Sequence, residues 1–125
     1  MPNKRPVVYW DSCVFIDRLQ ETGDQVELLH QLTDLAEKGG LLIVTSTLTI
    51  AEVIRLDNPD LMPWEELQKV HTYFFEHDWI SLRTPDRHVT EEAARLRQGY
   101  GLKTVDAVQL ATALSVHLTM GVTDD

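Results

Sequence analysis

Acidic residues lie at four places where predicted strands end or predicted helices begin: Asp11, Glu52, Asp106 and the neighbouring pair Asp124 and Asp125. Carboxylates gathered at one place repel one another and raise each other's pKa unless cations share the site. Mg²⁺ and Mn²⁺ prefer oxygen ligands, and such ions activate water and stabilise the charge of a reacting phosphodiester. These acids therefore predict a site for one or two Mg²⁺ or Mn²⁺ ions, with Asp124 or Asp125 as its fourth acid.

Two apolar runs lead toward the first two acids. Residues 7–10 are β-formers without alternation, as a parallel strand covered on both faces requires, and Asp11 follows them. Residues 41–45 form a second such run. The helix expected over residues 48–56 comes next, and Glu52 interrupts its apolar face. In open α/β sheets, the edge at the carboxyl ends of the strands is where ligands bind.

The remaining acids belong to the last third of the chain. Asp106 lies in the first turn of a helix predicted over residues 105–117, with Thr104 as its cap. Residues 118–123 are expected to form a further strand that ends at Asp125. All four acids are therefore expected at the same edge of one sheet.

The other elements alternate in type along the chain. A short helix is expected to follow a cap at Asp11 or Ser12. Further helices are predicted over residues 24–38, 64–77 and 90–97, and a strand over residues 79–82. This alternation predicts an α/β fold, a parallel sheet sandwiched between helices in three layers, within a single domain over residues 1–125. The chain stops directly after the last acids, so a C-terminal strand is expected to be missing.

Composition narrows the class of protein. The net charge is −9, from 20 acidic and 11 basic residues, which does not favour binding of nucleic acid by bulk electrostatics. No apolar run reaches the roughly 18 residues of a membrane span, so a cytoplasmic location is expected. Cys13 is the single cysteine, which excludes an internal disulfide, and it is expected to pack as a small apolar side chain.

Each acid also has an ordinary structural interpretation when it is taken alone. Asp11 could cap a helix, Asp106 could be a first-turn acid favoured by the helix dipole, and Asp124 or Asp125 could belong to a surface tail. Glu52 could pair with Arg55 one turn later. Four acids at equivalent points of the fold are less well explained in this way.

Two other groups of residues leave alternatives open. An aromatic group is expected to pack in the core, or else to form a dimer surface or a partner groove; it comprises Trp64, Tyr73, Phe74, Phe75 and Trp79. A basic stretch could contact RNA phosphates or an acidic partner, or pair with Asp86, Glu91 and Glu92; it comprises Arg83, Arg87, Arg95, Arg97 and Lys103. No glycine-rich phosphate-binding motif is present.

Four segments together resemble the PIN (PilT N-terminus) domain, and in particular the stand-alone VapC-type toxins of toxin–antitoxin pairs. The segments are Val-Val-Tyr-Trp-Asp11-Ser12-Cys-Val-Phe-Ile-Asp17, Thr45-Ser46-Thr47-Leu-Thr-Ile-Ala51-Glu52-Val, Leu102-Lys103-Thr104-Val105-Asp106-Ala107-Val-Gln-Leu-Ala111-Thr112-Ala113 and Val122-Thr123-Asp124-Asp125. The resemblance covers essentially the whole chain, and its specificity comes from the combination. Cys13 departs from the asparagine that is common in that family, and the chain lacks the aromatic residue and strand that usually follow the last aspartate.

The resemblance implies a parallel sheet between helices and a metal-dependent endoribonuclease. By resemblance, the catalytic and metal-binding acids are Asp11, Glu52, Asp106 and Asp125. Supporting hydrogen bonds to the site are expected from Ser12, Thr104 and Thr123. A cognate antitoxin and a homodimer are further expectations that rest on the resemblance alone.

Two functions from different classes follow. The first is a Mg²⁺- or Mn²⁺-dependent ribonuclease that hydrolyses RNA phosphodiester bonds as the toxin of a type II toxin–antitoxin pair. The alternative is a PIN-like domain without catalysis, which serves as a binding or scaffold module. Metal binding and RNA cleavage distinguish the two.

Overall fold

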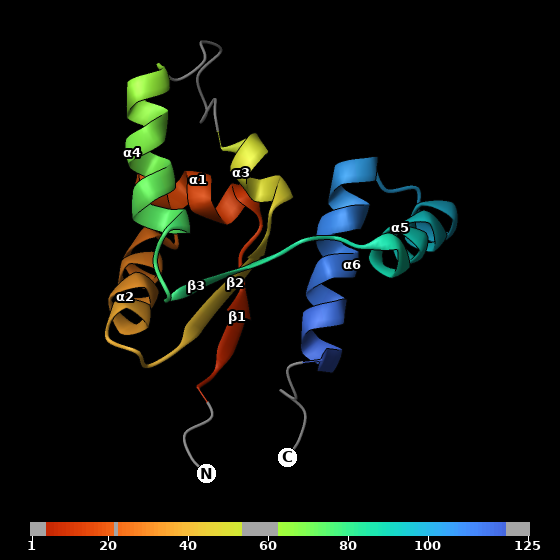
Figure 1. Ribbon diagram of the computed structural model, residues 1–125, viewed down its shortest axis with the longest axis horizontal. Helices are drawn as coiled ribbons and strands as arrows, with labels where there is room; N and C mark the ends of the chain where they lie inside the picture. Colours follow the sequence, from red (N-terminus) through yellow and green to blue (C-terminus); the bar gives the residue numbers. More distant parts are fainter. Residues whose placement is uncertain (1–4, 22, 54–62, 120–125) are drawn as a thin grey trace.

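The computed structural model describes residues 5–21, 23–53 and 63–119. Within this part of the chain, β1 (Val7–Tyr9), β2 (Leu42–Ser46) and β3 (Ile80–Arg83) form one parallel sheet in the order β1-β2-β3. Val8 pairs with Ile43, which in turn pairs with Ile80. The strands are parallel, so their carboxyl ends lie at one edge (Figure 1).

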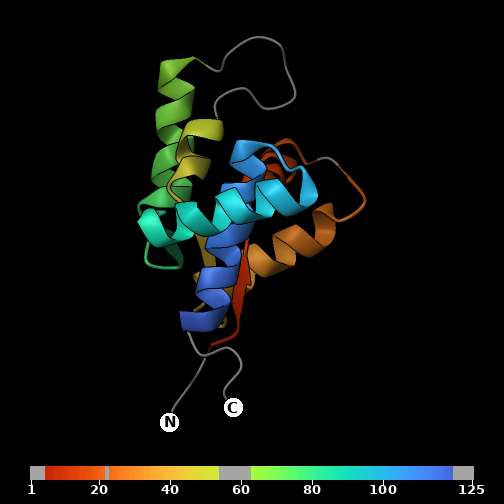
Figure 2. The same ribbon diagram turned by 90° about the vertical axis from the view of Figure 1, so that its right-hand side faces the viewer.

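Helices cover both faces of this sheet. They are α1 (Ser12–Gln20), α2 (Val26–Glu37), α3 (Leu48–Glu52), α4 (Trp64–Phe75), α5 (Arg87–Tyr100) and α6 (Thr104–Thr119). Figure 1 shows α1, α2 and α4 on one side of the sheet and α6 on the other, and Figure 2 shows α5 lying across α6. The predicted α/β architecture, a parallel sheet between helices, is confirmed.

Alternation along the strands divides the side chains between the two faces. Val8 and Ile43 pack into the cluster formed with α1, α2 and α4. Tyr9 and Val44, one residue further along, pack with Val116 of α6. Successive side chains of a strand point to opposite faces, so Tyr9 is directed toward α6.

Phe15 is the centre of the larger cluster. It is fully buried, and its ring lies edge-on to Trp10 and Phe74, at centroid distances of 5.1 and 5.2 Å. Phe75 and Trp79 pack against the same cluster, so these members of the aromatic group contribute to the core. Trp64, by contrast, is 64% exposed at the start of α4, where the expectation of core packing is wrong.

Small side chains line the contact between α5 and α6. Ala93 of α5 and Ala107 and Ala111 of α6 are buried where these helices meet. Side chains of this size let two helices approach closely. This contact fixes α6, and with it the first turn that carries Asp106.

Several element boundaries differ from the prediction, and the largest differences are in α3, α5 and α6. Helix α6 continues through residues 118 and 119, which were expected to begin a strand, because no glycine or proline interrupts the chain between Gly101 and Gly121. The rest of that predicted strand lies outside the described residues. Helix α3 ends at Glu52, where Val53 adopts a non-helical conformation. Helix α5 begins at Arg87 rather than residue 90, because Asp86 caps it.

Cys13 corrects a further expectation. The thiol was expected to pack as an apolar residue, but it is exposed on α1. Phe15 points inward from the same helix, so Cys13, two residues earlier, lies near the opposite side.

Among the described helices, none is long and apolar enough to cross a membrane.

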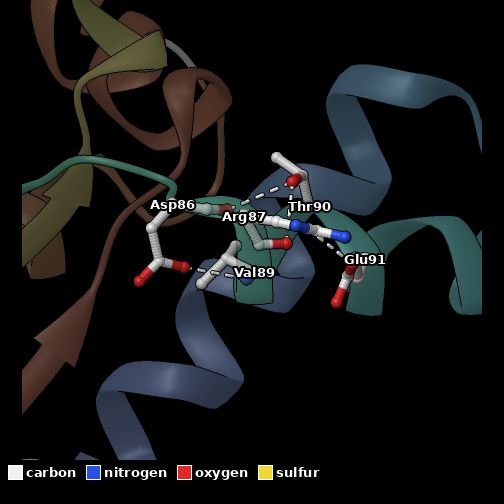
Figure 3. A network of polar contacts seen from close by, with 5 residues as sticks. All are labelled: Asp86, Arg87, Val89, Thr90 and Glu91. Atoms are coloured by element: carbon white, nitrogen blue, oxygen red, sulfur yellow. Dashed lines mark hydrogen bonds and ion pairs between the residues drawn. The ribbon is translucent and has the colours of Figure 1, made fainter.

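The N-terminal cap of α5 generates a test of the fold. The Asp86 Oδ1 atom accepts a hydrogen bond of 2.9 Å from the Val89 backbone N–H, as Figure 3 shows. We expect Asp86→Ala to lower the free energy of unfolding by about 1 kcal/mol, because a helix N–H loses its acceptor. Asp86→Asn should retain most of the stability, since asparagine caps equally well. Urea unfolding of both variants measures the difference, and equal losses would contradict this role.

Candidate functional site

Asp11 follows β1 directly and begins α1. Its Oδ1 atom accepts a hydrogen bond of 3.2 Å from the Val14 backbone N–H, so the capping role is real. An ionised carboxylate offers about four lone-pair sites, and one capping bond leaves capacity for a cation. The side chain is half-buried and lines a pocket. Capping and metal binding are therefore compatible at this residue.

Glu52 is the last residue of α3, which follows β2. Its Oε1 atom accepts a hydrogen bond of 2.9 Å from the Gln109 side-chain amide of α6. Arg55, the partner considered from the sequence, lies outside the described residues. The half-buried Glu52 carboxylate of α3 is thus held by a neutral donor from α6.

Asp106 lies in the first turn of α6 and is exposed. Figure 1 shows that α6 runs antiparallel to the strands, so its first turn lies at the same end of the molecule as the starts of α1 and α3. Asp106 and Asp11 line the same pocket. The structure therefore brings these two predicted site residues together.

The pocket has a volume of about 320 Å³ and opens to solvent. Its lining combines both carboxylates with polar and apolar side chains from β1, α1 and α6: Tyr9, Asp11, Val14, Asp106, Gln109, Leu110 and Ala113. Glu52 is joined to this pocket through Gln109, which contacts both.

Negative charge converges on this region. Cys13 is exposed, but partial desolvation of its thiol raises the thiol pKa, and the carboxylates of Asp11, Asp17, Glu52 and Asp106 raise it further. Asp11, Glu52 and Asp106 therefore act on a common point although they come from three different helical segments. An excess of acidic charge of this kind attracts cations.

The spacing of the acids limits how they can hold a metal ion. Within the described ranges, no three His, Cys, Asp or Glu side chains lie close enough together to hold one ion between them. Mg²⁺, however, keeps several waters and is commonly bound by one or two carboxylates together with substrate phosphates. The all-oxygen donors Asp11 and Asp106, with Glu52 nearby, fit a hydrated ion of this kind.

The other predicted site residues divide into two groups. Ser12 is the first residue of α1 and follows Asp11 directly. Thr104 was expected to cap α6, but it is already the first residue of that helix, two positions before Asp106. Thr123, Asp124 and Asp125 lie outside the described residues, and their role stays a prediction.

The basic stretch is partly used within α5. Arg87 pairs with Glu91 at 2.9 Å, and Arg95 pairs with Glu92 at 2.7 Å. Both are contacts between neighbouring turns of one helix, the ordinary role considered from the sequence. Asp86 serves as the helix cap, as described above.

Sequence reasoning missed two residues of the site, Tyr9 and Gln109. The Tyr9 hydroxyl donates a hydrogen bond of 2.5 Å to Gln109 Oε1, and both side chains line the pocket. Gln109 is only 6% exposed. A polar residue on the apolar side of a predicted helix was the available signal, because a buried amide needs partners.

Comparison with known proteins identifies the family of the chain. The family model that describes the PIN domain matches residues 8–125. The chain belongs to the PIN domain family. No curated protein matches the chain in sequence.

A solved structure resembles this PIN domain over most of its length. It is described as a toxin–antitoxin complex from Klebsiella pneumoniae, with a TM-score of 0.54 and 20% sequence identity. The match covers 87% of the present chain and 78% of the other. At this identity the likeness shows a shared fold.

The surroundings of Tyr9 predict how the stability of this PIN domain depends on pH when no metal is bound. Burial raises its pKa from 10.0 to about 12, helped by the charges of Asp11 and Glu52 and opposed by hydrogen bonds with Ser46 and Thr112. The folded pKa exceeds the unfolded one, so the stability it contributes is present below pH 10 and is lost as pH rises through about 12.

We therefore expect Tyr9 to ionise late when the ultraviolet absorbance of tyrosinate is followed in the presence of a chelator. Subtracting the titration of Tyr9→Phe identifies the residue. A difference curve centred near pH 10 would contradict burial of this hydroxyl beside the acids.

Proposed function

We propose that this PIN domain is a Mg²⁺- or Mn²⁺-dependent endoribonuclease that hydrolyses RNA phosphodiester bonds. The observation that carries the proposal is the pocket in which Asp11 and Asp106 meet, with Glu52 attached to it through Gln109. Membership of the PIN family supports a nuclease, since nuclease activity is general among PIN domains.

In this proposal the acids hold the cation. Asp11 uses the coordination capacity left by its capping bond, Asp106 approaches from α6, and Glu52 adds charge from α3. Asp125, or Asp124 in its place, would complete the set. When bound, the cation supplies an activated water and stabilises negative charge at the phosphodiester.

The open pocket suits a polymeric substrate. Its mouth is accessible to solvent, and the exposed position of Asp106 at its lining leaves room for a phosphate to approach. The net charge of −9 opposes RNA binding at long range, but a divalent cation reverses the local field at the site itself. Substrate binding is therefore expected to depend strongly on the metal.

We further propose that the protein acts in the cytoplasm as the toxin of a type II toxin–antitoxin pair, as a homodimer with a cognate antitoxin. The similar fold of a chain described as part of a toxin–antitoxin complex supports this role. Co-expression with a neighbouring small open reading frame, followed by purification of the complex, tests the partnership.

Asp11→Asn tests the metal site. Asparagine caps helices as well as aspartate does, so α1 should remain intact while the pocket loses a charged ligand. We expect Mg²⁺-dependent cleavage of RNA to fall by roughly 10²-fold or more, equivalent to about 3 kcal/mol of transition-state stabilisation. A cleavage assay with and without Mg²⁺, with the cut sites mapped, measures the effect.

Asp86→Asn is the matched control. It makes the same chemical change at another aspartate cap, on α5 and away from the lining of the pocket. Its cleavage rate should equal that of the wild type. Unchanged cleavage by Asp11→Asn, or an equal loss in both variants, would refute the assignment of Asp11.

Thermal melting in increasing Mn²⁺ separates the enzyme from a binding or scaffold module. A ligand that binds only the folded state stabilises it by about 2.7 kcal/mol at 100 times its dissociation constant. We expect the melting temperature of the wild type to rise with Mn²⁺ and that of a combined Asp11→Asn and Asp106→Asn variant to rise much less. Equal rises in both proteins would place the metal elsewhere.

A further inference from the structure

Gln109 lies where three elements, α6, β1 and α3, meet at the edge of the pocket. Its Oε1 atom accepts from the Tyr9 hydroxyl of β1. Its Nε2 atom donates to Glu52 Oε1 at 2.9 Å and to Thr49 Oγ1 at 3.0 Å, both on α3. One amide of α6 thus joins a strand and a helix that each contribute to the site.

The direction of these bonds follows from the donors available. The Thr45 hydroxyl has one hydrogen and donates it to the Trp10 carbonyl at 2.6 Å. In the 2.7 Å contact between the two threonine hydroxyls, Thr49 must therefore be the donor and Thr45 the acceptor. Thr49 then accepts from Gln109. The result is a one-way chain from the Gln109 amide to the carbonyl of Trp10, the residue before Asp11. Bonds aligned in this way strengthen one another.

The charge of Glu52 sets the orientation of the Gln109 amide. In the opposite orientation, the amide oxygen would face the Glu52 carboxylate at 2.9 Å, and two acceptors would repel each other. With the observed orientation, every hydrogen bond has a donor and an acceptor. The network is therefore compatible with an ionised Glu52 only in this arrangement.

Neutrality is the property that suits Gln109 to this position. An arginine or lysine could also hold Glu52, but its positive charge would offset the carboxylate and weaken attraction for a cation. An amide fixes the direction of the carboxylate and leaves its full negative charge. The Glu52 carboxylate is thereby restrained before any ligand binds. Less side-chain entropy is therefore lost when a cation binds.

We propose that Gln109 is a positioning residue, which holds Glu52 through its amide nitrogen and the backbone before Asp11 through the threonine chain. This inference rests on the proposed function, because it assigns Gln109 to the same cation site. Gln109 touches neither substrate nor reacting atoms in this proposal, and it acts through the two acids.

The test compares Gln109→Met with Thr33→Val in the full chain. Methionine has nearly the same shape as glutamine but cannot donate a hydrogen bond. Thr33 is a buried hydroxyl of α2 that bonds to Leu29 and Arg18, on the other side of the sheet, so its loss matches the removal of a buried polar group. Mn²⁺ affinity is measured by calorimetry, and kcat and KM for RNA cleavage are measured at several Mn²⁺ concentrations.

We expect Gln109→Met to weaken Mn²⁺ binding by about 10- to 100-fold, as is typical when a partner of a metal ligand is removed. The loss of kcat should shrink as Mn²⁺ is raised, while KM for RNA at saturating Mn²⁺ stays close to that of the wild type. Thr33→Val should lower the melting temperature without changing Mn²⁺ affinity. Wild-type Mn²⁺ affinity in Gln109→Met would overturn the inference, and so would an equal loss in Thr33→Val.

Tyr9→Phe provides a second, milder variant if Gln109→Met does not fold. It removes only the donor to the amide oxygen, so a smaller loss of Mn²⁺ affinity is expected, and an unchanged affinity would count against the inference. A wild-type protein that neither binds Mn²⁺ nor cleaves RNA would instead refute the proposed function, and the inference with it. The two failures are thus distinguishable.

Discussion

Burial of β2 along its whole length is the constraint on which the rest of the molecule depends. Every residue from Leu42 to Ser46 is buried, because helices cover both faces and strands flank both sides. A strand in this position cannot leave its polar end groups to water. The hydroxyls of Thr45 and Ser46 therefore bond to neighbouring chain segments, the first to Trp10 and Thr49 and the second to the Leu48 backbone. These bonds determine where β1 ends and how α3 begins.

The acids of the site acquire their positions from this arrangement. Asp11 follows the carbonyl that Thr45 holds, and Glu52 ends the helix that begins beside Ser46. Asp106 depends on α6, which the small residues of α5 and the sheet hold from two sides. Carboxylates that repel one another need such rigid support, since nothing in their own interaction brings them together. The packing of apolar residues thus maintains a concentration of negative charge that a cation can use.

Local patterns were sufficient for much of the fold. Uninterrupted β-formers at residues 7–10 and 41–45 predicted buried parallel strands, and apolar periodicity predicted the helices, because both signals arise from burial over a few neighbouring residues. Boundaries were less accurate. The start of α5 depends on a single bond, because its Asp86 cap lies four residues before the predicted helix start. The continuation of α6 to Thr119 depends on the absence of a helix breaker. Cys13 differed because the side of α1 that faces solvent is decided by packing around Phe15.

The sequence by itself determined the class of the protein and its candidate acids: the order of strands and helices, and carboxylates after the strands, identify a PIN domain. Tertiary structure alone decided how those acids are supported. Tyr9 and Gln109 are 100 positions apart, and Glu52 is 57 positions from Gln109, so no local pattern relates them. Their contact arises only when α6 packs on the sheet and turns one buried amide toward β1 and α3. Long-range hydrogen bonds of this kind are set by the geometry of packed layers, which short-range propensities do not encode.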